Sequence, residues 1–340
     1  MKTNPYKAVS FKQSAIEACL EQGAGLIADC KYDGVRLNLI VADNGTLFLS
    51  RVAKTIPALE HLNGFSERWA AFLADDRQPF KAGLMIDGEV MVKGVDFNTG
   101  SGLLRTCHLK DTNYQFDVSG LKGFDKKLNK EKMPFGIAPQ HLKVVVYGAI
   151  PLDIVESGAD YERMNVLMQS DCCVQVALLE EHFPEIEWTI AESHDVFSMD
   201  ELNVLYDGVR EAGHEGLVVK DPMGFYRRGK KTGWWKMKPE DEEDGIVQGL
   251  IWGTPGKANE GKVIGFQCLL ENGVNVDVTN ITQAQMEEFT ATVRDYPEHE
   301  EFFNGFQVQI KYMEKTPDGS LRHPAFVCFR GTEENPSEKI

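Results

Sequence analysis

Long apolar stretches are missing from this sequence. Nowhere in its 340 residues does an apolar run approach the roughly 20 residues that a membrane-spanning helix needs. The first residues, Met-Lys-Thr-Asn-Pro-Tyr-Lys, lack the apolar centre of a secretory signal peptide. Hydrophobic residues make up 42% of the chain and charged residues 26%, which is typical of a globular protein. We therefore expect a cytoplasmic protein of one large or two smaller domains, without a membrane partner.

Paired cysteines are missing too. The seven cysteines form no Cys-x-x-Cys motif, and their number is odd. This pattern argues against a zinc site and against a disulfide framework, and it indicates buried free thiols.

Positive charge is scarce. The formal net charge is −16 at pH 7, whereas a nucleic-acid-binding domain is usually basic. Net charge does not exclude a local basic face, however, and the stretch 226–238 holds six basic residues, two adjacent tryptophans and no acid. Its cations are Arg227, Arg228, Lys230, Lys231, Lys236 and Lys238. The stretch is either a solvated surface strand or a nucleic-acid-binding strip, and binding through it should be strongly salt-sensitive.

Apolar periodicity and turn residues predict two regions. In the first, helices are predicted at 12–22, 57–75, 159–184 and 199–212, and strands at 25–31, 36–42, 45–51, 84–92, 142–150, 215–221 and 233–238. The segment 93–140 is predicted to be irregular. The acidic run 239–244 predicts a connection between domains 1–239 and 240–340. Beyond it, five short strands and a helix at 282–294 suit a small barrel of the OB type, or a β-sandwich.

The stretch Lys31-Tyr-Asp-Gly-Val-Arg36 lies between two apolar segments and predicts a tight turn between strands. A lysine held at the end of a buried strand, near another cation, can act as a nucleophile through its neutral amine. Taken alone, the motif also fits a charged hairpin turn.

Acidic residues recur in or beside predicted core strands. Asp87 and Glu89 lie two residues apart in an apolar strand and so share a face. Two acids on one face indicate a metal ion or a ribose hydroxyl, although a single acid in a strand is usually a surface residue. Glu215 and Lys220 bracket a further apolar strand.

Two lysines and a tyrosine lie in the other strands. Lys236 and Lys238 share a strand face, where they would repel each other unless an anion such as phosphate lies between them. Tyr147 lies in a valine-rich strand and fits either the core or a stack on a purine.

Taken in order, these motifs resemble those of the covalent nucleotidyltransferases, which comprise DNA ligases, RNA ligases and mRNA capping enzymes. The matching pattern is Lys-x-Asp-Gly-x-Arg, Ser-Arg, Asp-Gly-Glu, a strand aromatic, Glu-Gly-x-x-x-Lys and Trp-x-Lys-x-Lys. The stretches 97–105, 229–239 and 318–326 look like the small ATP-dependent DNA ligases of short-tailed bacteriophages. The resemblance implies an α+β fold, in which a nucleotidyltransferase (adenylation) domain of antiparallel sheets flanked by helices precedes an OB-fold β-barrel.

The resemblance also implies residue roles. Lys31 is expected to attack the α-phosphate of ATP and carry AMP, with Lys236 and Lys238 as catalytic partners. The nucleotide-binding residues it implies are Asp29, Cys30, Arg36, Arg51, Glu89, Tyr147, Lys220, Lys236 and Lys238, with Tyr147 stacked on adenine and backbone groups of Asp29 and Cys30 at its edge. Glu89 and Glu215 would hold Mg²⁺ or Mn²⁺. Contacts to DNA or pyrophosphate would come from Arg105, Arg227, Arg228, Lys230, Lys231, Arg322 and Arg330.

The last motif departs from the family pattern. It usually ends Arg-x-Asp-Lys and orients the leaving pyrophosphate, but here Arg330-Gly-Thr-Glu333 keeps only the arginine. Arg322 and Lys311 are the other candidates for that task.

The activity that the resemblance implies is ATP-dependent sealing of nicked double-stranded DNA in phage replication, repair or recombination, by a monomer in the host cytoplasm. The alternatives are an RNA ligase, a GTP-dependent mRNA capping enzyme and a non-catalytic module that binds nicked DNA. An NAD-dependent ligase is disfavoured because zinc-ligand cysteines are absent.

Overall fold

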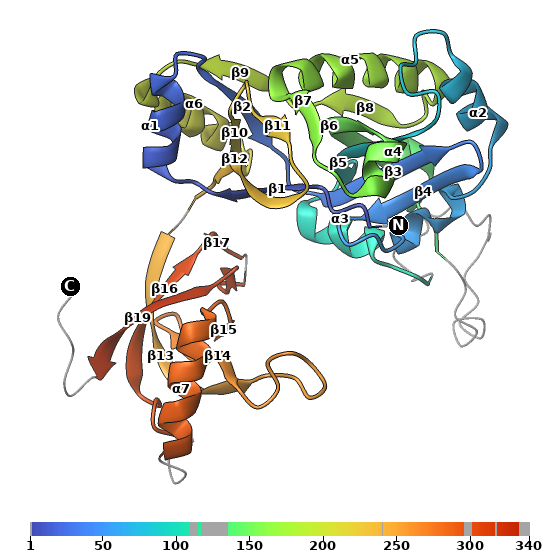
Figure 1. Ribbon diagram of the computed structural model, residues 1–340. Helices are drawn as coiled ribbons and strands as arrows, with labels where there is room; N and C mark the ends of the chain where they lie inside the picture. The colour runs from blue at the N-terminus through green and yellow to red at the C-terminus, as the bar shows by residue number, and fades with distance from the viewer. Residues whose placement is uncertain are drawn as a thin grey trace, which may run out of the picture. The chain divides into compact units, whose positions relative to one another are not determined.

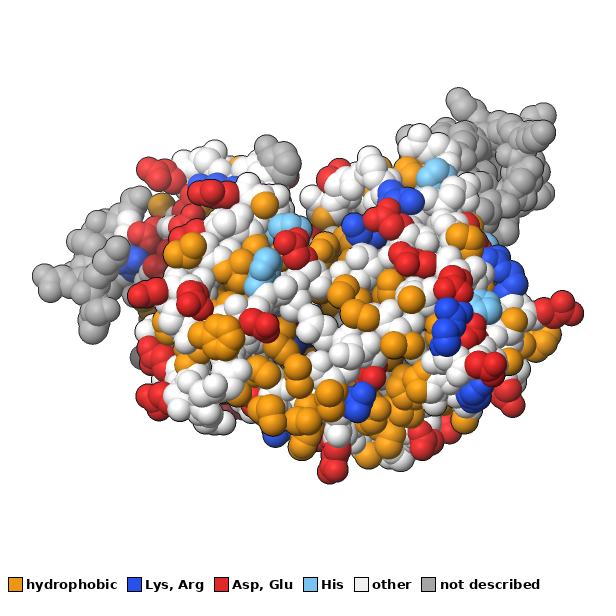
Figure 2. All heavy atoms as spheres, turned by 90° about the horizontal axis from the view of Figure 1, so that it is seen from above, with side chains coloured by type: hydrophobic (Ala, Val, Ile, Leu, Met, Phe, Trp, Pro, Cys, Tyr) orange, Lys and Arg blue, Asp and Glu red, His pale blue; other side chains and the backbone are white. Residues whose placement is uncertain are grey.

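The computed structural model describes residues 2–108, 115–116, 135–239, 241–295, 301–316 and 318–332. The chain separates into two compact units, Met1–Met237 and Lys238–Ile340, both drawn in Figure 1. Among the described residues, no helix is both long enough and apolar enough to cross a membrane. Acidic side chains are scattered over the face seen in Figure 2, in keeping with the net charge of −16.

Unit 1 contains two five-stranded sheets. The first has the order β1 (Tyr6–Ser10), β12 (Gly229–Met237), β10 (Gly216–Lys220), β2 (Leu26–Lys31) and β9 (Ser193–Val196). The second has the order β4 (Gly45–Ser50), β3 (Val35–Ala42), β5 (Leu84–Val92), β6 (Leu142–Pro151) and β8 (Glu187–Ile190). Most strand pairs in these sheets are antiparallel, as predicted, but each sheet is mixed, because β1 runs parallel to β12 and β8 runs parallel to β6.

Helices flank both sheets of unit 1 (Figure 1). They are α1 (Gln13–Glu21) and α6 (Met199–Glu211) beside the first sheet, α5 (Asn165–His182) against the second, and α2 (Glu67–Ala74), α3 (Phe97–Leu104) and α4 (Leu152–Ser157) around it. Apolar side chains of α1 and α6 pack with Leu26, Ala28 and Cys30 of β2 in one core cluster. Because side chains alternate along a strand, Ile27, Asp29 and Lys31 of β2 point to the opposite face, where the candidate site lies.

In its described residues, unit 2 contains a five-stranded antiparallel sheet and one α-helix. Its strand order is β15 (Asn275–Val278), β14 (Val263–Leu270), β13 (Asp241–Trp252), β16 (Phe306–Tyr312) and β19 (Ala325–Thr332), and its helix is α7 (Gln283–Asp295). A two-stranded ladder joins β17 (Glu314–Lys315) to β18 (Leu321–Arg322). The core gathers around Phe266, whose ring lies 5.2 Å from that of Phe289. The expected strands and helix are present, but the described ladders leave the sheet open rather than closed into a barrel.

Two predicted helices have different bounds in the structure. The helix predicted at 57–75 is a 3₁₀ helix, η1 (Pro57–Leu62), followed by α2, and Gly64 interrupts them by exchanging main-chain hydrogen bonds with Thr46. The helix predicted at 159–184 begins only at Asn165, because β7 (Tyr161–Met164) pairs with β11 (Phe225–Tyr226). In both places a long-range backbone contact overrides local propensity.

Two other segments differ from the predictions. Residues 97–104, expected to be irregular, form α3, and the Asp96 side chain caps its first turn by accepting from the Thr99 amide at 3.0 Å. Residues 109–114 and 117–134 of that segment lie outside the described part of the chain. The acidic run is not a free connection, because Asp241–Asp244 opens β13 and pairs with residues 309–312 of β16.

Candidate active site

Lys31 is the last residue of β2, and Gly216 of β10 is its partner across the sheet. Glu215 lies directly before Gly216, so its carboxylate reaches the Lys31 amine and forms an ion pair with it. The two side chains are 24% and 9% exposed. The pairing of β2 with β10 therefore joins two sequence motifs into one site, with a carboxylate rather than a cation against the Lys31 amine.

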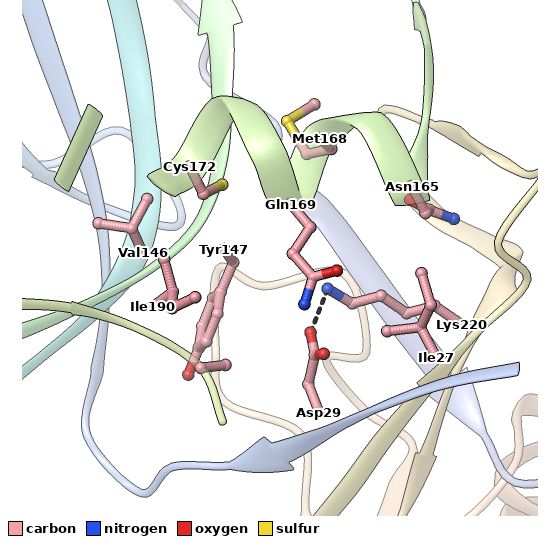
Figure 3. A pocket seen from close by; sticks show the side chains of 11 residues that line it. Ile27, Asp29, Val146, Tyr147, Asn165, Met168, Gln169, Cys172, Ile190 and Lys220 are labelled. Carbon is pink, nitrogen blue, oxygen red and sulfur yellow. Dashed lines mark ion pairs between the residues drawn. The ribbon is translucent and has the colours of Figure 1, made fainter. Parts of the chain in front are cut away.

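A pocket opens on the same face of β2, beside α5. Its lining residues are Ile27, Asp29, Val146, Tyr147, Asn165, Met168, Gln169, Cys172, Ile190, Ala191 and Lys220. Figure 3 shows Asp29 and Lys220 facing each other, with the Gln169 amide above them and the Tyr147 ring to one side. Asp29 and Lys220 form an ion pair with only 10% of each side chain exposed. Apolar walls, an aromatic ring and a few polar groups suit a heteroaromatic base.

The Lys220 side chain is held from a second direction. Its Nζ lies 4.2 Å from the centroid of the Trp234 ring, a cation–π contact. Trp234 is 2% exposed; its Nε1 donates to Asn165 Oδ1 at 2.9 Å, and Asn165 Nδ2 donates to the carbonyl of Asp221 at 2.7 Å. These contacts fix the Lys220 ammonium at the pocket wall.

Arg36 is anchored by Asp87. Its Nε lies 2.6 Å from Asp87 Oδ1 and its Nη2 lies 2.7 Å from Oδ2. Asp87 is fully buried and also accepts hydrogen bonds from Tyr226 Oη at 2.5 Å and from Asn38 Nδ2 at 3.0 Å. Because burial raises the pKa of Tyr226 well above its usual value, the phenol keeps the proton that it donates. Asp87 is therefore a structural partner of Arg36, and the expectation that it joins Glu89 on a metal or ribose is not supported.

Glu89 is a half-buried acid whose charge interacts with that of Lys31. Burial raises the pKa of Glu89 to about 7; the positive charges of Arg36 and Lys31 oppose this rise, and the carboxylates Glu215 and Asp87 add to it. A divalent cation would relieve the repulsion between Glu89 and Glu215. Carboxylate oxygens beside substrate phosphates are the ligands that Mg²⁺ prefers, so this pair fits the predicted metal site.

Gly88 lies between the two acids at a register shift in the β5–β6 pairing. A Cβ atom placed there would lie 2.4 Å from the carbonyl oxygen of Val145 in β6. Only glycine allows the two strands to approach this closely. Tyr147 follows two residues later on β6, and its ring centroid lies 5.0 Å from the guanidinium carbon of Arg36.

The basic strip does not present all its cations to solvent. Arg227, Lys230 and Lys231 are exposed, and Lys231 pairs with Asp160 at 2.9 Å. Arg228 is 5% exposed, and its guanidinium donates to the carbonyls of Asn4 and Lys2 at 3.2 and 3.0 Å. Arg228 therefore ties the N-terminal segment to β12, and its place among the DNA contacts is corrected.

The remaining predicted residues lie apart from the pocket lining. Arg51 is exposed in the turn after β4, and Arg105 is exposed at the end of α3. Lys236 lies in β12, and Lys238 directly follows that strand. In unit 2, Arg322 pairs with Glu314 at 2.6 Å, Arg330 pairs with Asp244 at 2.8 Å, and Lys311 lies in β16. Glu333 lies outside the described residues.

Cys30 belongs to the other face of β2. Its side chain is in the core with α1 and α6, and its amide donates to the carbonyl of Glu192 at 2.7 Å. Its N–H is therefore already taken by a main-chain carbonyl, and a contact between the other backbone groups of Asp29 and Cys30 and adenine stays a prediction. Sequence reasoning missed Asn165 and Gln169, because no motif distinguishes the pocket-facing side of α5.

Comparison with known proteins identifies the family. Residues 5–238 match the ATP dependent DNA ligase domain, and residues 239–303 and 299–330 match the DNA ligase C-terminal domain. The chain belongs to the ATP-dependent DNA ligase family. The DNA ligase of Enterobacteria phage T3 is 56% identical, over 99% of this chain and 99% of the relative. The DNA ligase of Escherichia phage T7 is 54% identical, over 100% of this chain and 99% of the relative.

A solved ligase structure covers the same length of chain. The ATP-dependent DNA ligase from bacteriophage T7 in complex with ATP is 55% identical, covers 97% of this chain and 99% of its own, and gives a TM-score of 0.66. These matches confirm the predicted ligase family and its two-domain fold, a nucleotidyltransferase domain followed by an OB-fold domain. The RNA ligase, capping enzyme and non-catalytic alternatives are not favoured.

Proposed function

We propose that this ATP-dependent DNA ligase seals nicks between 3′-hydroxyl and 5′-phosphate ends in duplex DNA, with Lys31 as the nucleophile. The observation that carries this proposal is the position of Lys31 at the end of β2, on the same face as a pocket that holds an ion pair and an aromatic ring. We place the adenine of ATP in this pocket, against Tyr147 and beside Asp29 and Lys220. The α-phosphate then points toward Lys31.

In the first step, the neutral amine of Lys31 attacks the α-phosphorus. An N–P bond forms, the P–O bond to pyrophosphate breaks, and the amine loses a proton. The ion pair with Glu215 holds this amine as an ammonium, so one proton passes to the solvent before the attack and a second follows it, while the carboxylate stays charged. Lys236 and Lys238, with Lys220, hold phosphate oxygens, so that catalysis rests on positioning and charge stabilisation.

In the second step, an oxygen of the DNA 5′-phosphate attacks the phosphorus of AMP and releases Lys31. In the third, the 3′-hydroxyl attacks the activated 5′-phosphate, the new phosphodiester bond forms, and AMP leaves. Arg36, fixed by Asp87, binds the ribose or the 5′-phosphate. Arg51, Arg105, Arg227, Lys230 and Lys231 contact the DNA backbone, since these cations are exposed.

Glu89 and Glu215 are the residues that would hold Mg²⁺ or Mn²⁺. When bound, such an ion neutralises phosphate charge during transfer. Glu89 also suits a ribose hydroxyl, because its carboxylate would accept a hydrogen bond from that group. For the leaving pyrophosphate we propose Arg330, with Arg322 and Lys311 as further candidates.

We place this reaction in the host cytoplasm, where the enzyme would act as a monomer on phage DNA during replication, repair or recombination. The full-length similarity to the T3 and T7 phage ligases supports this setting. We take residues 1–239 and 240–340 as the two domains, because the two family matches meet at 238 and 239.

The test is covalent labelling with α-labelled ATP and Mg²⁺, followed by denaturation. Wild type and Lys81→Ala, which replaces an exposed lysine of the same unit, should carry labelled AMP, and Lys31→Ala should not. Labelling with ATP but not GTP, and sealing of nicked DNA in preference to nicked RNA, complete the assignment. A labelled Lys31→Ala protein would overturn it.

A further inference from the structure

Three potential metal ligands converge behind the nucleophile's strand. The ligand atoms of Cys30, Glu192 and His194 all lie within 4.8 Å of one another. Sheet pairing brings them together: β2 lies beside β9, His194 is the partner of Ala28, and the Cys30 amide donates to the carbonyl of Glu192. Glu192 and His194 lie two residues apart, and their side chains approach to 3.4 Å between Oε1 and Nε2.

This cluster is separate from the site that binds ATP. The Cys30 side chain belongs to the core cluster with α1 and α6, whereas Asp29, its neighbour on β2, lines the pocket. The carboxylates assigned to Mg²⁺, Glu89 and Glu215, are not members of the cluster. An ion held here would therefore occupy the reverse face of β2.

The chemistry of the three ligands selects a class of ion. Thiolate and imidazole favour borderline ions such as Zn²⁺, whereas Mg²⁺ prefers oxygen ligands alone. Zinc bonds of about 2.0 to 2.3 Å in tetrahedral geometry place ligand atoms roughly 3.3 to 3.8 Å apart, so small side-chain movements would complete the site. The Glu192 and His194 side chains are 60% and 38% exposed, which gives the ion a path from solvent to the buried sulfur.

We propose that Cys30, Glu192 and His194 form a binding site for a zinc-class divalent ion, with the fourth position open to water. This site is invisible to a search for Cys-x-x-Cys pairs, because pairing of two distant strands assembles it. The Cys30 thiol would lose its proton to the solvent on binding. Since Cys30 directly precedes Lys31, an ion that ties it to Glu192 and His194 restrains the strand end that carries the nucleophile, and we expect it to slow adenylation.

Cobalt titration tests binding without any reliance on activity. Co²⁺ added to the metal-free full-length chain should bind in one equivalent and give the near-ultraviolet charge-transfer band of a cobalt–thiolate bond, which Zn²⁺ then removes. Glu192→Gln and His194→Ala, both at exposed or half-exposed positions, should weaken binding at least tenfold, and Cys30→Ser should abolish the band. Cys173→Ser, which removes an exposed thiol outside the cluster, should leave it intact. A wild type without the band, or a band unchanged in His194→Ala and Cys30→Ser, would overturn the proposal.

A second measurement tests the link to Lys31. With Mg²⁺ saturating, low concentrations of Zn²⁺ should slow AMP labelling of the wild type, and Glu192→Gln and His194→Ala should resist this effect. Equal inhibition of all three proteins would mean that Zn²⁺ acts at the Mg²⁺ carboxylates, and the restraint on Lys31 would be refuted. If no protein, wild type included, is labelled when Zn²⁺ is left out of the assay, that result counts against the ligase assignment. The cobalt titration would still decide whether the metal site exists.

Discussion

Arg36 and Asp87 are joined by two parallel hydrogen bonds, of 2.6 and 2.7 Å, inside the second sheet of unit 1. The carboxylate also accepts from Tyr226 and Asn38, so its oxygens are fully engaged. A bidentate pair of this kind fixes the guanidinium in orientation as well as position. Arg36 reaches the Tyr147 side of the pocket in a rigid conformation because of this buried anchor.

We predict that Asp87→Asn lowers the free energy of unfolding by about 3–5 kcal/mol, because it leaves the Arg36 charge without its partner in the core. Urea denaturation measures the loss. Asp171→Asn is the matched control. Asp171 also accepts two hydrogen bonds from one arginine, Arg163, both of 2.7 Å, but the Arg163 side chain is 35% exposed. The control should lose about 1 kcal/mol or less. Similar losses in the two variants would show that Asp87 is not a buried anchor.

The Asp29–Lys220 pair gives a prediction in which stability and activity separate. Lys220→Met keeps an apolar contact with Trp234 but leaves the Asp29 carboxylate without its ion-pair partner. Asp29→Asn leaves the Lys220 ammonium without its partner in the same way. Each single variant should therefore unfold more easily than the double variant, which carries no unpaired charge. Thermal melts should show this order, while AMP labelling stays at least tenfold reduced in all three. A double variant less stable than both singles would contradict the prediction.

Glu89 predicts an unusual response to pH. Its folded pKa of about 7 lies above its ordinary value of 4.5, so Glu89 favours the folded state at low pH, and this contribution is lost as pH rises through about 7. Glu89→Gln should accordingly melt at a higher temperature than wild type near pH 8, with a smaller difference near pH 5. Its AMP labelling should be strongly reduced, because glutamine cannot supply the carboxylate.

The control for this prediction is Glu211→Gln, at an exposed position of α6. Its melting temperature should follow that of the wild type at both pH values. Labelling by the wild type should rise from about pH 6 to about pH 8 as Glu89 loses its proton. A Glu89→Gln protein that is less stable than wild type near pH 8 would refute the role of burial.

The basic strip allows a comparison between two neighbouring cations. Lys230→Ala should weaken binding to nicked DNA and reduce the slope of log K against log salt by about one unit, as expected for the loss of one phosphate contact. Arg228→Ala should instead destabilise the fold, because Arg228 is buried against main-chain carbonyls, and should leave the slope unchanged. Fluorescence anisotropy at several salt concentrations measures both. A reduced slope for Arg228→Ala would restore it to the DNA contacts.

The pyrophosphate end of the reaction can be tested by separating its steps. Arg330→Gln should slow AMP labelling of the enzyme at least tenfold, because the leaving group loses a positive partner. It should seal a pre-adenylated nick at nearly the wild-type rate, since no pyrophosphate leaves in that step. Equal loss in both assays would point to a general role of the Arg330–Asp244 pair in the fold of unit 2.

Sequence reasoning located the residues that stand at the ends of core strands. Apolar runs end or begin at Lys31, Glu215 and Lys220. The pairing of β2 with β10 is then enough to bring these residues close to one another. The burial of Arg228 was not predictable, because it depends on β1 crossing over to lie parallel to β12. Long-range strand pairing of this kind leaves no local signal in the sequence.

The pocket wall formed by α5 shows a second limit. Asn165 and Gln169 were missed because α5 carries buried polar residues such as Gln175 among its apolar ones, so apolar periodicity does not mark its inner face. The cluster of Cys30, Glu192 and His194 escaped for a related reason, since its members come from two strands far apart in the chain.

The absence of a side chain at Gly88 sets a dimension of the active site. Any methyl group there would collide with the carbonyl of Val145 and push β6 outward, together with Tyr147 two residues further on. The close approach of β5 and β6 therefore depends on the absence of a Cβ atom at Gly88, and it fixes the position of Tyr147 at the pocket. Gly88 thus constrains both the strand that carries Glu89, our proposed metal ligand, and the neighbouring strand that carries Tyr147.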